Sequence, residues 1–189
     1  MIKRLFLMFL LILLLAAGGL WYKLHMPYKG FSSEVLLDIS PGTSTSGMAK
    51  LLHNAGVIQS EWEFLVVRAL HSGTKLQAGE YKFDRALPVT DVYSKIARGD
   101  VFYYELRVPE GSTIFEIAEE VGKLRFLSSK EFLKEARNPS LIRDLAPAAL
   151  SLEGYLFPST YRITKRTSVR QICREMTSQF RKVWTQIGG

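Results

Sequence analysis

Cysteine and histidine are scarce in this sequence, and the few that occur are scattered. The 189 residues contain one Cys and three His, which are His25, His53 and His71. A single Cys cannot form a disulfide within the chain, nor can it build a zinc site of several cysteines. The histidines lack the spacing of metal ligands. These scarcities argue against a zinc or iron enzyme, and we expect no cofactor.

Acidic residues are nearly missing from both ends of the chain, which carries a net charge of +7. Residues 1–30 contain four Lys and Arg and no acid, and residues 162–189 contain seven Lys and Arg with Glu175 as the one acid. The segment between them is net acidic. A nucleic-acid-binding domain concentrates its basic residues on the folded body. We therefore expect no nucleic-acid partner.

The sequence also has no Gly-rich phosphate loop and no Gly-x-Ser-x-Gly motif of serine hydrolases. Ser151 and Ser159 are not followed by any His that could activate them as nucleophiles. Hydrophobic residues make up 47% of the chain, which excludes disorder as its main state. A folded protein whose chemistry rests on other residue types is indicated.

A long uncharged run stands at the N-terminus. It extends from Leu5 to Trp21, behind Lys3 and Arg4. As a helix this run spans roughly 25 Å, close to the thickness of a bilayer's hydrocarbon core. The preceding basic residues predict a cytoplasmic N-terminus, with the rest of the chain outside the cytoplasm.

Two other interpretations of this run remain. A cleaved signal peptide would use the small residues 16–18, but its apolar region is usually only about 7–15 residues long. A buried helix of a soluble protein is disfavoured by the extreme N-terminal position behind two bases. We favour a single-pass anchor held in the membrane by residues 5–22.

After a linker at residues 26–33, the pattern predicts a β-α-α-β module. Residues 34–39 and 78–83 have strand composition. Between them, one apolar helical pattern follows Thr43 and ends at Gly56, and a second begins at a capping box formed by Ser60 and Glu63. A linking helix is expected over 88–98, closed by Gly99.

The same order returns later in the chain. Residues 101–108 predict a strand, a helix follows with apolar residues at 114, 117, 118 and 121, and Ser128-Ser129 caps another. A shift of 69 residues places Gly42 on Gly111 and Ser60 on Ser129. We therefore expect a duplicated module in an α+β protein. Its return strand is expected at 153–158, after about six inserted residues around 138–148.

The copies differ at the glycine that this alignment pairs. Ala78-Gly79 in the first becomes Glu153-Gly154 in the second, within an otherwise apolar stretch. Apolar surroundings disfavour the charged form of a carboxylate, so Glu153 is a candidate general acid. Nearby aromatic rings, at Tyr155, Phe157 and Tyr161, could contact sugar rings. The alternative is that Glu153 is an ordinary solvated charge on the outer face of a strand.

The remaining candidates have simpler interpretations. Glu116, Glu119 and Glu120 lie opposite the apolar face of their helix, so we expect a solvated stripe. Glu110 fits a turn or a helix cap. Cys173 lies within the amphipathic pattern of the last helix and is expected to be a small core residue.

Two motifs resemble those of a known family. They are Val-Pro-Glu-Gly-Ser-Thr-Ile-Phe-Glu-Ile-Ala (108–118) and Leu-Glu-Gly-Tyr-Leu-Phe-Pro-Ser-Thr-Tyr (152–161). Together with the N-terminal anchor and the first module, they resemble the endolytic murein (peptidoglycan) transglycosylases of bacteria. The resemblance implies that the first module is LysM-like and that the second is the N-terminal part of a catalytic domain.

The resemblance also implies an activity. Family enzymes cut the β-1,4 bond between N-acetylmuramic acid and N-acetylglucosamine in nascent peptidoglycan, which terminates glycan strands with 1,6-anhydromuramoyl ends. Glu153 matches the family's single acid and base. One carboxylate suffices because the substrate's own 6-hydroxyl is the nucleophile. The implied location is the bacterial inner membrane with a periplasmic domain, and peptidoglycan synthases are implied partners.

The chain departs from the family pattern in two ways. Ser159 stands where the family usually carries an acid, and we assign it to substrate binding with Tyr155, Phe157 and Tyr161. Family chains also continue well beyond the basic amphipathic helix at 169–187, so this chain resembles a C-terminally truncated member with an incomplete catalytic domain. The alternative function is therefore a non-catalytic, membrane-tethered peptidoglycan-binding or scaffold protein.

These expectations give four segments. Residues 1–25 form the cytoplasmic tip and membrane anchor, and residues 26–33 are a linker. Residues 34–99 form the LysM-like module with its linking helix. Residues 100–189 form the transglycosylase-like domain.

Overall fold

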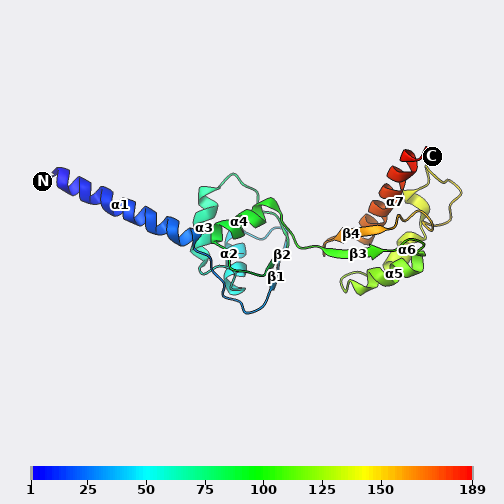
Figure 1. The fold of residues 1–189 in the computed structure, drawn as a ribbon, viewed down its shortest axis with the longest axis horizontal. Helices are drawn as coiled ribbons and strands as arrows, with labels where there is room; N and C mark the ends of the chain where they lie inside the picture. Colours follow the sequence, from blue (N-terminus) through cyan, green and yellow to red (C-terminus); the bar gives the residue numbers. More distant parts are fainter. Residues whose placement is uncertain (1, 189) are drawn as a thin grey trace. The chain divides into compact units, whose positions relative to one another are not determined.

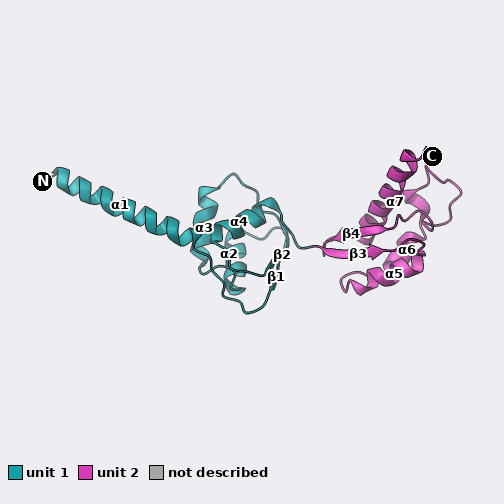
Figure 2. Cartoon of the chain, viewed as in Figure 1, with its two compact units in different colours: residues 1–102 teal, residues 103–189 magenta. Residues whose placement is uncertain are grey.

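The structure, a computed structural model, describes residues 2–188, which form two compact units. Unit 1 comprises residues 1–102 and unit 2 comprises residues 103–189 (Figure 2). The division falls a few residues after the boundary expected at 99/100. Each unit combines helices with a two-stranded antiparallel sheet, so the α+β class is confirmed.

Unit 1 begins with one long helix and continues with a β-α-α-β-α module (Figure 1). The elements are α1 (Ile2–His25), β1 (Val35–Ile39), α2 (Thr45–Asn54), α3 (Glu61–Leu70), β2 (Gly79–Phe83) and α4 (Val89–Arg98). β1 pairs with β2 in the register Val35↔Phe83. α2 packs against α3 and α3 against α4, and together they cover a core that includes Phe64 and Tyr81.

α1 is long and apolar enough to cross a membrane. Its described span Lys3–His25 has a mean hydropathy of 2.4 and is exposed over the window that qualifies. A signal sequence would pass the same test. The end of the helix contacts the module, where Leu24 is 4% exposed and Lys23 Nζ lies 3.5 Å from Glu63 Oε1.

Unit 2 repeats the order of unit 1. Its elements are β3 (Tyr104–Val108), α5 (Ile114–Lys123), α6 (Ser129–Ala136), the short 3₁₀ helix η1 (Pro139–Leu141), β4 (Ser159–Ile163) and α7 (Val169–Gln186). The shift of 69 residues carries β1 onto β3 and α2 onto α5. β3 pairs with β4 in the register Tyr104↔Ile163, which matches that of unit 1.

The prediction of a return strand at residues 153–158 is wrong. Residues 151–156 form turns and bends, in which Gly154 has φ +80°, and β4 begins only at Ser159. From this point the copies are related by a shift of 80 residues, which carries β2 onto β4 and the start of α4 onto the start of α7. Glu153 therefore lies in a segment inserted before the strand and does not replace Ala78.

The tyrosines confirm this second shift. Tyr81 donates a hydrogen bond from its hydroxyl to the Gln77 carbonyl, and Tyr161 donates one to the Phe157 carbonyl. The backbone N–H groups of the same two acceptor residues bond to α4 and α7 respectively, at Ile96 O and Met176 O. α4 and α7 are therefore matching elements, and the repeated unit is β-α-α-β-α.

The capping box expected at Ser60 and Glu63 is also wrong. Ser60 is the N-cap residue of α3, but its side chain makes no capping hydrogen bond. Glu63 is buried, and its Oε1 atom faces Lys23 without any hydrogen-bond partner. The Glu63 side chain turns toward the end of α1 instead of back toward Ser60, so it does not form its half of a capping box.

The other strand and helix limits agree closely with expectation. Residues 101–103 precede β3 instead of forming part of it. Gly99 closes α4 with φ +68°, as the sequence predicts. Cys173 is buried in the core of unit 2, as expected.

Candidate functional site

The inserted segment of unit 2 occupies residues 137–158, between α6 and β4. Ile142 and Leu152 anchor it because both side chains are fully buried in the core. The backbone N–H of Leu152 donates to Ala136 O at 2.7 Å, which ties the segment to the end of α6. The segment is therefore a fixed part of unit 2.

Arg181 of α7 fastens the same segment at its other end. Its Nη2 atom donates to Leu141 O at 2.6 Å and to Asp144 Oδ1 at 2.7 Å, and Nη1 donates to Asp144 Oδ2. This forked pairing lowers the pKa of Asp144 to about 2. The pair is therefore charged throughout the neutral range, and it holds the segment against α7.

Glu153 lies where this segment passes the first turn of α5. Its Oε2 atom accepts a hydrogen bond from the Ile114 backbone N–H at 3.0 Å, and its own N–H donates to Ser151 Oγ at 3.2 Å. Ile114 is the first residue of α5. N–H groups at a helix N-terminus have no partner within the helix and carry partial positive charge, so they hold a carboxylate well.

The surroundings of Glu153 differ from the apolar pocket expected from the sequence. Glu153 is exposed, and its carboxylate accepts a hydrogen bond from the polar backbone N–H of Ile114. The apolar residues of its segment, Leu152 and Leu156, turn into the core instead of enclosing the carboxylate. The apolar composition of residues 148–158 thus reflects anchoring of the segment.

A second carboxylate caps the same helix end. Glu116 accepts from the Thr113 N–H at 2.7 Å while Thr113 Oγ1 accepts from the Glu116 N–H at 3.3 Å, which is a complete capping box. Hydrogen bonds from Thr113 lower the pKa of Glu116. Glu116 is thus occupied in the cap of its own helix. Glu153, in contrast, reaches this helix end from the inserted segment.

An apolar groove of about 320 Å³ begins at Gly154, the residue that follows Glu153. Gly154, Phe157 and Pro158 line it from the inserted segment, and Phe180, Val183, Trp184 and Ile187 line it from the end of α7 and just beyond. Tyr155 makes an edge contact with Phe180 at a centroid distance of 5.3 Å. Phe180 in turn stacks with Trp184 at 5.9 Å.

Tyr155 and Phe157, which were predicted to contact sugar rings, lie at this groove, whereas Phe180 and Trp184 were not predicted. These two aromatic residues lie four positions apart on α7. That spacing puts them on one face of a helix, and it is the signal that could have identified them. Trp184 is 42% exposed, so it has surface available for a ligand.

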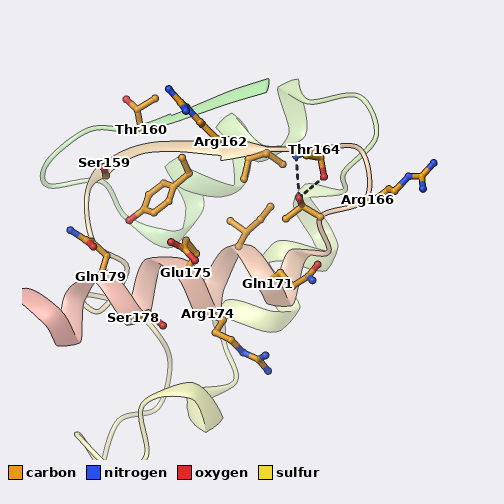
Figure 3. A pocket seen from close by; sticks show the side chains of 14 residues that line it. Ser159, Thr160, Arg162, Thr164, Arg166, Gln171, Arg174, Glu175, Ser178 and Gln179 are labelled. Atoms are coloured by element: carbon orange, nitrogen blue, oxygen red, sulfur yellow. Dashed lines mark hydrogen bonds between the residues drawn. The ribbon is translucent and has the colours of Figure 1, made fainter. Parts of the chain in front are cut away.

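Tyr161 and Ser159 lie elsewhere. Tyr161 is only 7% exposed and belongs to the core, and burial raises the pKa of its hydroxyl to about 12. Ser159 is exposed and lines a second, larger groove of about 760 Å³ between β4 and α7 (Figure 3). The five residues predicted for the site are thus divided between the helix end, the apolar groove, this second groove and the core.

Within residues 2–188, the structure shows no group of three or more His, Cys, Asp or Glu that could hold a metal ion. Cys173 is fully buried, and burial raises the pKa of its thiol to about 12. Such a thiol is neutral and inaccessible, which fits a core residue.

Relatives of the chain are named for one activity. This chain is 28% identical over 201 residues to an endolytic murein transglycosylase of Streptococcus pneumoniae, and the match covers 89% of this chain and 36% of the relative. It is 27% identical over 167 residues to the endolytic murein transglycosylase of Bacillus subtilis, covering 80% of this chain and 46% of the relative. The chain thus spans less than half the length of these curated relatives.

A crystal structure and a family profile add to this comparison. A yceG-like protein from Listeria monocytogenes is 26% identical, with a TM-score of 0.40, and the match covers 82% of this chain and 56% of that one. The profile of the YceG-like family matches residues 37–188. This match runs from β1 to the end of α7 and includes both copies of the repeat, the inserted segment and Glu153, so the chain belongs to the YceG-like family.

Proposed function

We propose that the chain is a membrane-anchored lytic transglycosylase of peptidoglycan that uses Glu153 as its general acid and base. It cuts the β-1,4 bond between N-acetylmuramic acid and N-acetylglucosamine within nascent strands and leaves 1,6-anhydromuramoyl ends. Support comes from the names of the relatives and from family membership. The observation that carries the proposal is the bond from the Ile114 N–H to Glu153 Oε2, which fixes this carboxylate at the start of α5.

In the proposed reaction Glu153 donates one proton and then accepts another. Protonated Glu153 gives its proton to the bridging oxygen as the bond from this oxygen to muramoyl C1 breaks. The 6-hydroxyl oxygen of the same muramoyl residue then bonds to C1, and its proton passes to Glu153. Water is not consumed, and the carboxyl group ends in the form in which it began.

The hydrogen bond to Oε2 supports this role by fixing the position of the group. With Oε2 held by Ile114, we assign the proton transfer to the Oε1 atom. A bound glycan would displace water from the exposed carboxylate, so that the proton is exchanged with the substrate instead of with solvent. The sugar rings would rest against the apolar groove beside Gly154, where aromatic residues offer flat faces.

The location follows from α1 and the charge around it. We infer that α1 remains in the bacterial inner membrane, because its length and composition suit a bilayer and Lys3 and Arg4 precede the apolar run. The N-terminus then lies in the cytoplasm and both units face the periplasm. Unit 1 would act as a LysM-like glycan-binding module near the membrane, within reach of peptidoglycan synthases.

The test is digestion of purified peptidoglycan with the full chain in detergent. We expect wild type to generate 1,6-anhydromuramoyl ends, counted by liquid chromatography and mass spectrometry. Glu153→Gln should lower their rate of formation about 100-fold or more, because the amide cannot transfer the proton. Glu119→Gln is the matched control, since Glu119 is an exposed acid on α5, the helix whose first residue donates to Glu153. It should leave the rate unchanged.

Two results would contradict the proposal. Equal formation of ends by wild type and Glu153→Gln would exclude Glu153 as the catalyst. Retention of wild type on insoluble peptidoglycan without any new ends would show a tethered scaffold protein instead of an enzyme.

A further inference from the structure

The strands β2 and β4 match each other, but within residues 2–188 a further segment pairs with the outer edge of β2 alone. In unit 1, residues 100–102, called the strap below, turn back after α4 and cross this edge. The Phe102 N–H donates to Glu80 O at 2.6 Å. The Val101 side chain lies against Gly79, so closely that a Cβ on this glycine would come within 2.3 Å of it. The strap is possible because Gly99 ends α4 in the left-handed conformation.

The described residues of unit 2, 103–188, form no strap. Gln179 takes the place of Gly99, and α7 continues through this position to Gln186. The residues that would form a strap are therefore helical. Within residues 2–188, β4 forms strand pairs with β3 and with no other segment.

The larger groove follows the uncovered edge. Its volume is about 760 Å³, and all residues from 159 to 164 line it, as do Ser178 and Gln179 at the place where a strap would begin. Figure 3 shows the groove between β4 and α7, with Thr160 and Arg162 pointing away from α7 and Glu175 lying between strand and helix. Because both sheets have the same register, Thr160 corresponds to Glu80, whose carbonyl oxygen faces the strap.

We propose that the outer edge of β4 is a docking site for an extended acidic segment of a partner polypeptide, which adds to the sheet as a third strand. An uncovered edge presents unpaired N–H and C=O groups at alternate residues, and an added strand satisfies them. The strap of unit 1 is the template for this pairing.

The positive charge of the residues along the groove favours an acidic occupant. Arg162, Arg166 and Arg174 line the groove, and Glu175 is the one acidic residue among those that line it. Glu105 of β3 lies opposite Arg162 in the sheet, so the lining keeps a net positive charge with Glu105 counted. Acidic side chains on the outer face of an added strand would lie near Arg162. A second copy of the chain fits poorly, because antiparallel pairing of β4 with itself would place the two Arg162 side chains directly opposite or on diagonal positions of one face, and both arrangements bring like charges close.

The template also restricts the occupant. Unit 1 has Gly79 beneath Val101, whereas unit 2 has Ser159 at the matching position. The side chain of Ser159 takes space that the glycine leaves open. A bulky residue is therefore disfavoured opposite Ser159, and pairing should centre on Thr160 and Arg162.

This inference is separate from the proposed function, because it concerns a peptide and a different surface of unit 2. The test measures fluorescence anisotropy of a labelled, blocked heptapeptide of alternating Glu and Val with the full chain in a non-ionic detergent. Two matched peptides serve as controls. One has Lys in place of Glu, and the other is N-methylated at alternate residues so that it cannot donate backbone hydrogen bonds.

We expect the acidic peptide to bind about tenfold more tightly than either control peptide. Arg162→Glu should reverse the preference, so that the Lys peptide binds more tightly. Arg125→Glu makes the same change at an exposed position between α5 and α6 and should leave the preference as in wild type. On binding, the amides of Thr160 and Arg162 should become protected from hydrogen exchange.

Three outcomes would overturn the inference. Equal binding of the N-methylated peptide would show simple charge attraction without strand pairing. An unchanged preference in Arg162→Glu would place the peptide elsewhere. Self-association that protects the β4 amides and excludes the peptide would make a second copy the occupant.

Discussion

The two units of this chain share the β-α-α-β-α order, their strand register and a buried tyrosine. They differ in the connection before the second strand and in the length of the last helix. Unit 1 joins its second module helix to β2 through residues 71–78, whereas unit 2 uses residues 137–158. Unit 1 ends its last helix at Gly99, whereas α7 continues to Gln186. All the candidate functional surfaces of unit 2 arise from these two differences.

The longer connection and the longer helix depend on each other. Arg181, which anchors the inserted segment, lies in the part of α7 that has no counterpart in α4. So do Phe180 and Trp184 of the apolar groove. The continuation of α7 past Gln179 therefore supports Glu153 on one side and leaves the edge of β4 open on the other. Divergence of a repeat is a guide to function here because the shared elements carry the fold.

The largest effects should come from the two cores, and they test whether the units are stable separately. Phe64 and Phe132 are both fully buried, one in each core. Phe132→Ala should destabilise unit 2 by about 3–5 kcal/mol through loss of contacts and a cavity, and Phe64→Ala should do the same to unit 1.

Hydrogen exchange with mass spectrometry, on the full chain in detergent, locates each effect. Each variant should accelerate exchange in its own unit alone. Phe115→Ala is the control, since Phe115 is exposed on α5 and its loss should cost less than about 0.5 kcal/mol. Faster exchange of both units in either core variant would show that the copies unfold together.

The next largest effect should come from Gly99, which ends α4 at the position where α7 of unit 2 continues. Gly99 has φ +68°, and a Cβ there would lie 2.4 Å from Gln77 Oε1. Gly99→Ala should cost about 2 kcal/mol through backbone strain and displacement of Gln77, and the Phe102 amide of the strap should exchange faster.

Gly42→Ala is the matched control for this change. Gly42 has φ +82° but nothing within 4 Å of a new Cβ, so strain alone should cost about 1 kcal/mol. Denaturant titration of both variants measures the difference. If the two cost the same, or if the strap amide is unaffected, Gly99 does not control the path of the strap.

The sequence predicted most of the repeat because its signals are local. Apolar spacing, glycine stops and the Ser128 cap identified the six helices of the two copies and three of their four strands within a few residues. The last strand failed because the copies were aligned on Gly79 and Gly154, although Tyr81-Lys82-Phe83 resembles Tyr161-Arg162-Ile163 more closely. An alignment on tyrosine would have shown the longer insertion.

The site was predictable only in part. Glu153 stands out in the sequence, but its partner does not, since the Ile114 N–H comes from a helix 39 residues earlier in the chain. Main-chain donors have no residue type by which a sequence could reveal them. Tyr161 was assigned to the substrate because aromatic residues clustered there, and only the tertiary fold shows which of them point into the core.

A smaller effect should appear at alkaline pH, to which Cys173 contributes in unit 2 beside Tyr161, whose pKa burial also raises to about 12. Burial raises the pKa of Cys173 from about 9 to about 12. The folded chain then holds this proton more tightly than the unfolded chain, so stability is complete below pH 9 and falls as pH rises toward 12. The loss should be at most about 1.4 kcal/mol per pH unit.

Denaturation of unit 2 at pH 8 and pH 11 measures this loss. Cys173→Ala should lose less stability between the two pH values than wild type does. Thr177→Ala is the control, because Thr177 is buried on the same helix but does not titrate. It should lower stability equally at both pH values. If Cys173→Ala has the wild-type slope, the thiol does not contribute to it.

The smallest effects, and the sharpest test of the match between the copies, come from the paired tyrosines. Tyr81→Phe and Tyr161→Phe each remove a hydroxyl that donates to a carbonyl four residues earlier. Each should cost about 1 kcal/mol, since a partly buried carbonyl loses its partner. Denaturant titrations should give values within about 0.5 kcal/mol of each other. A Tyr161→Phe variant of full stability that binds or cleaves peptidoglycan poorly would contradict this equivalence, because its hydroxyl would then serve the substrate instead of the fold.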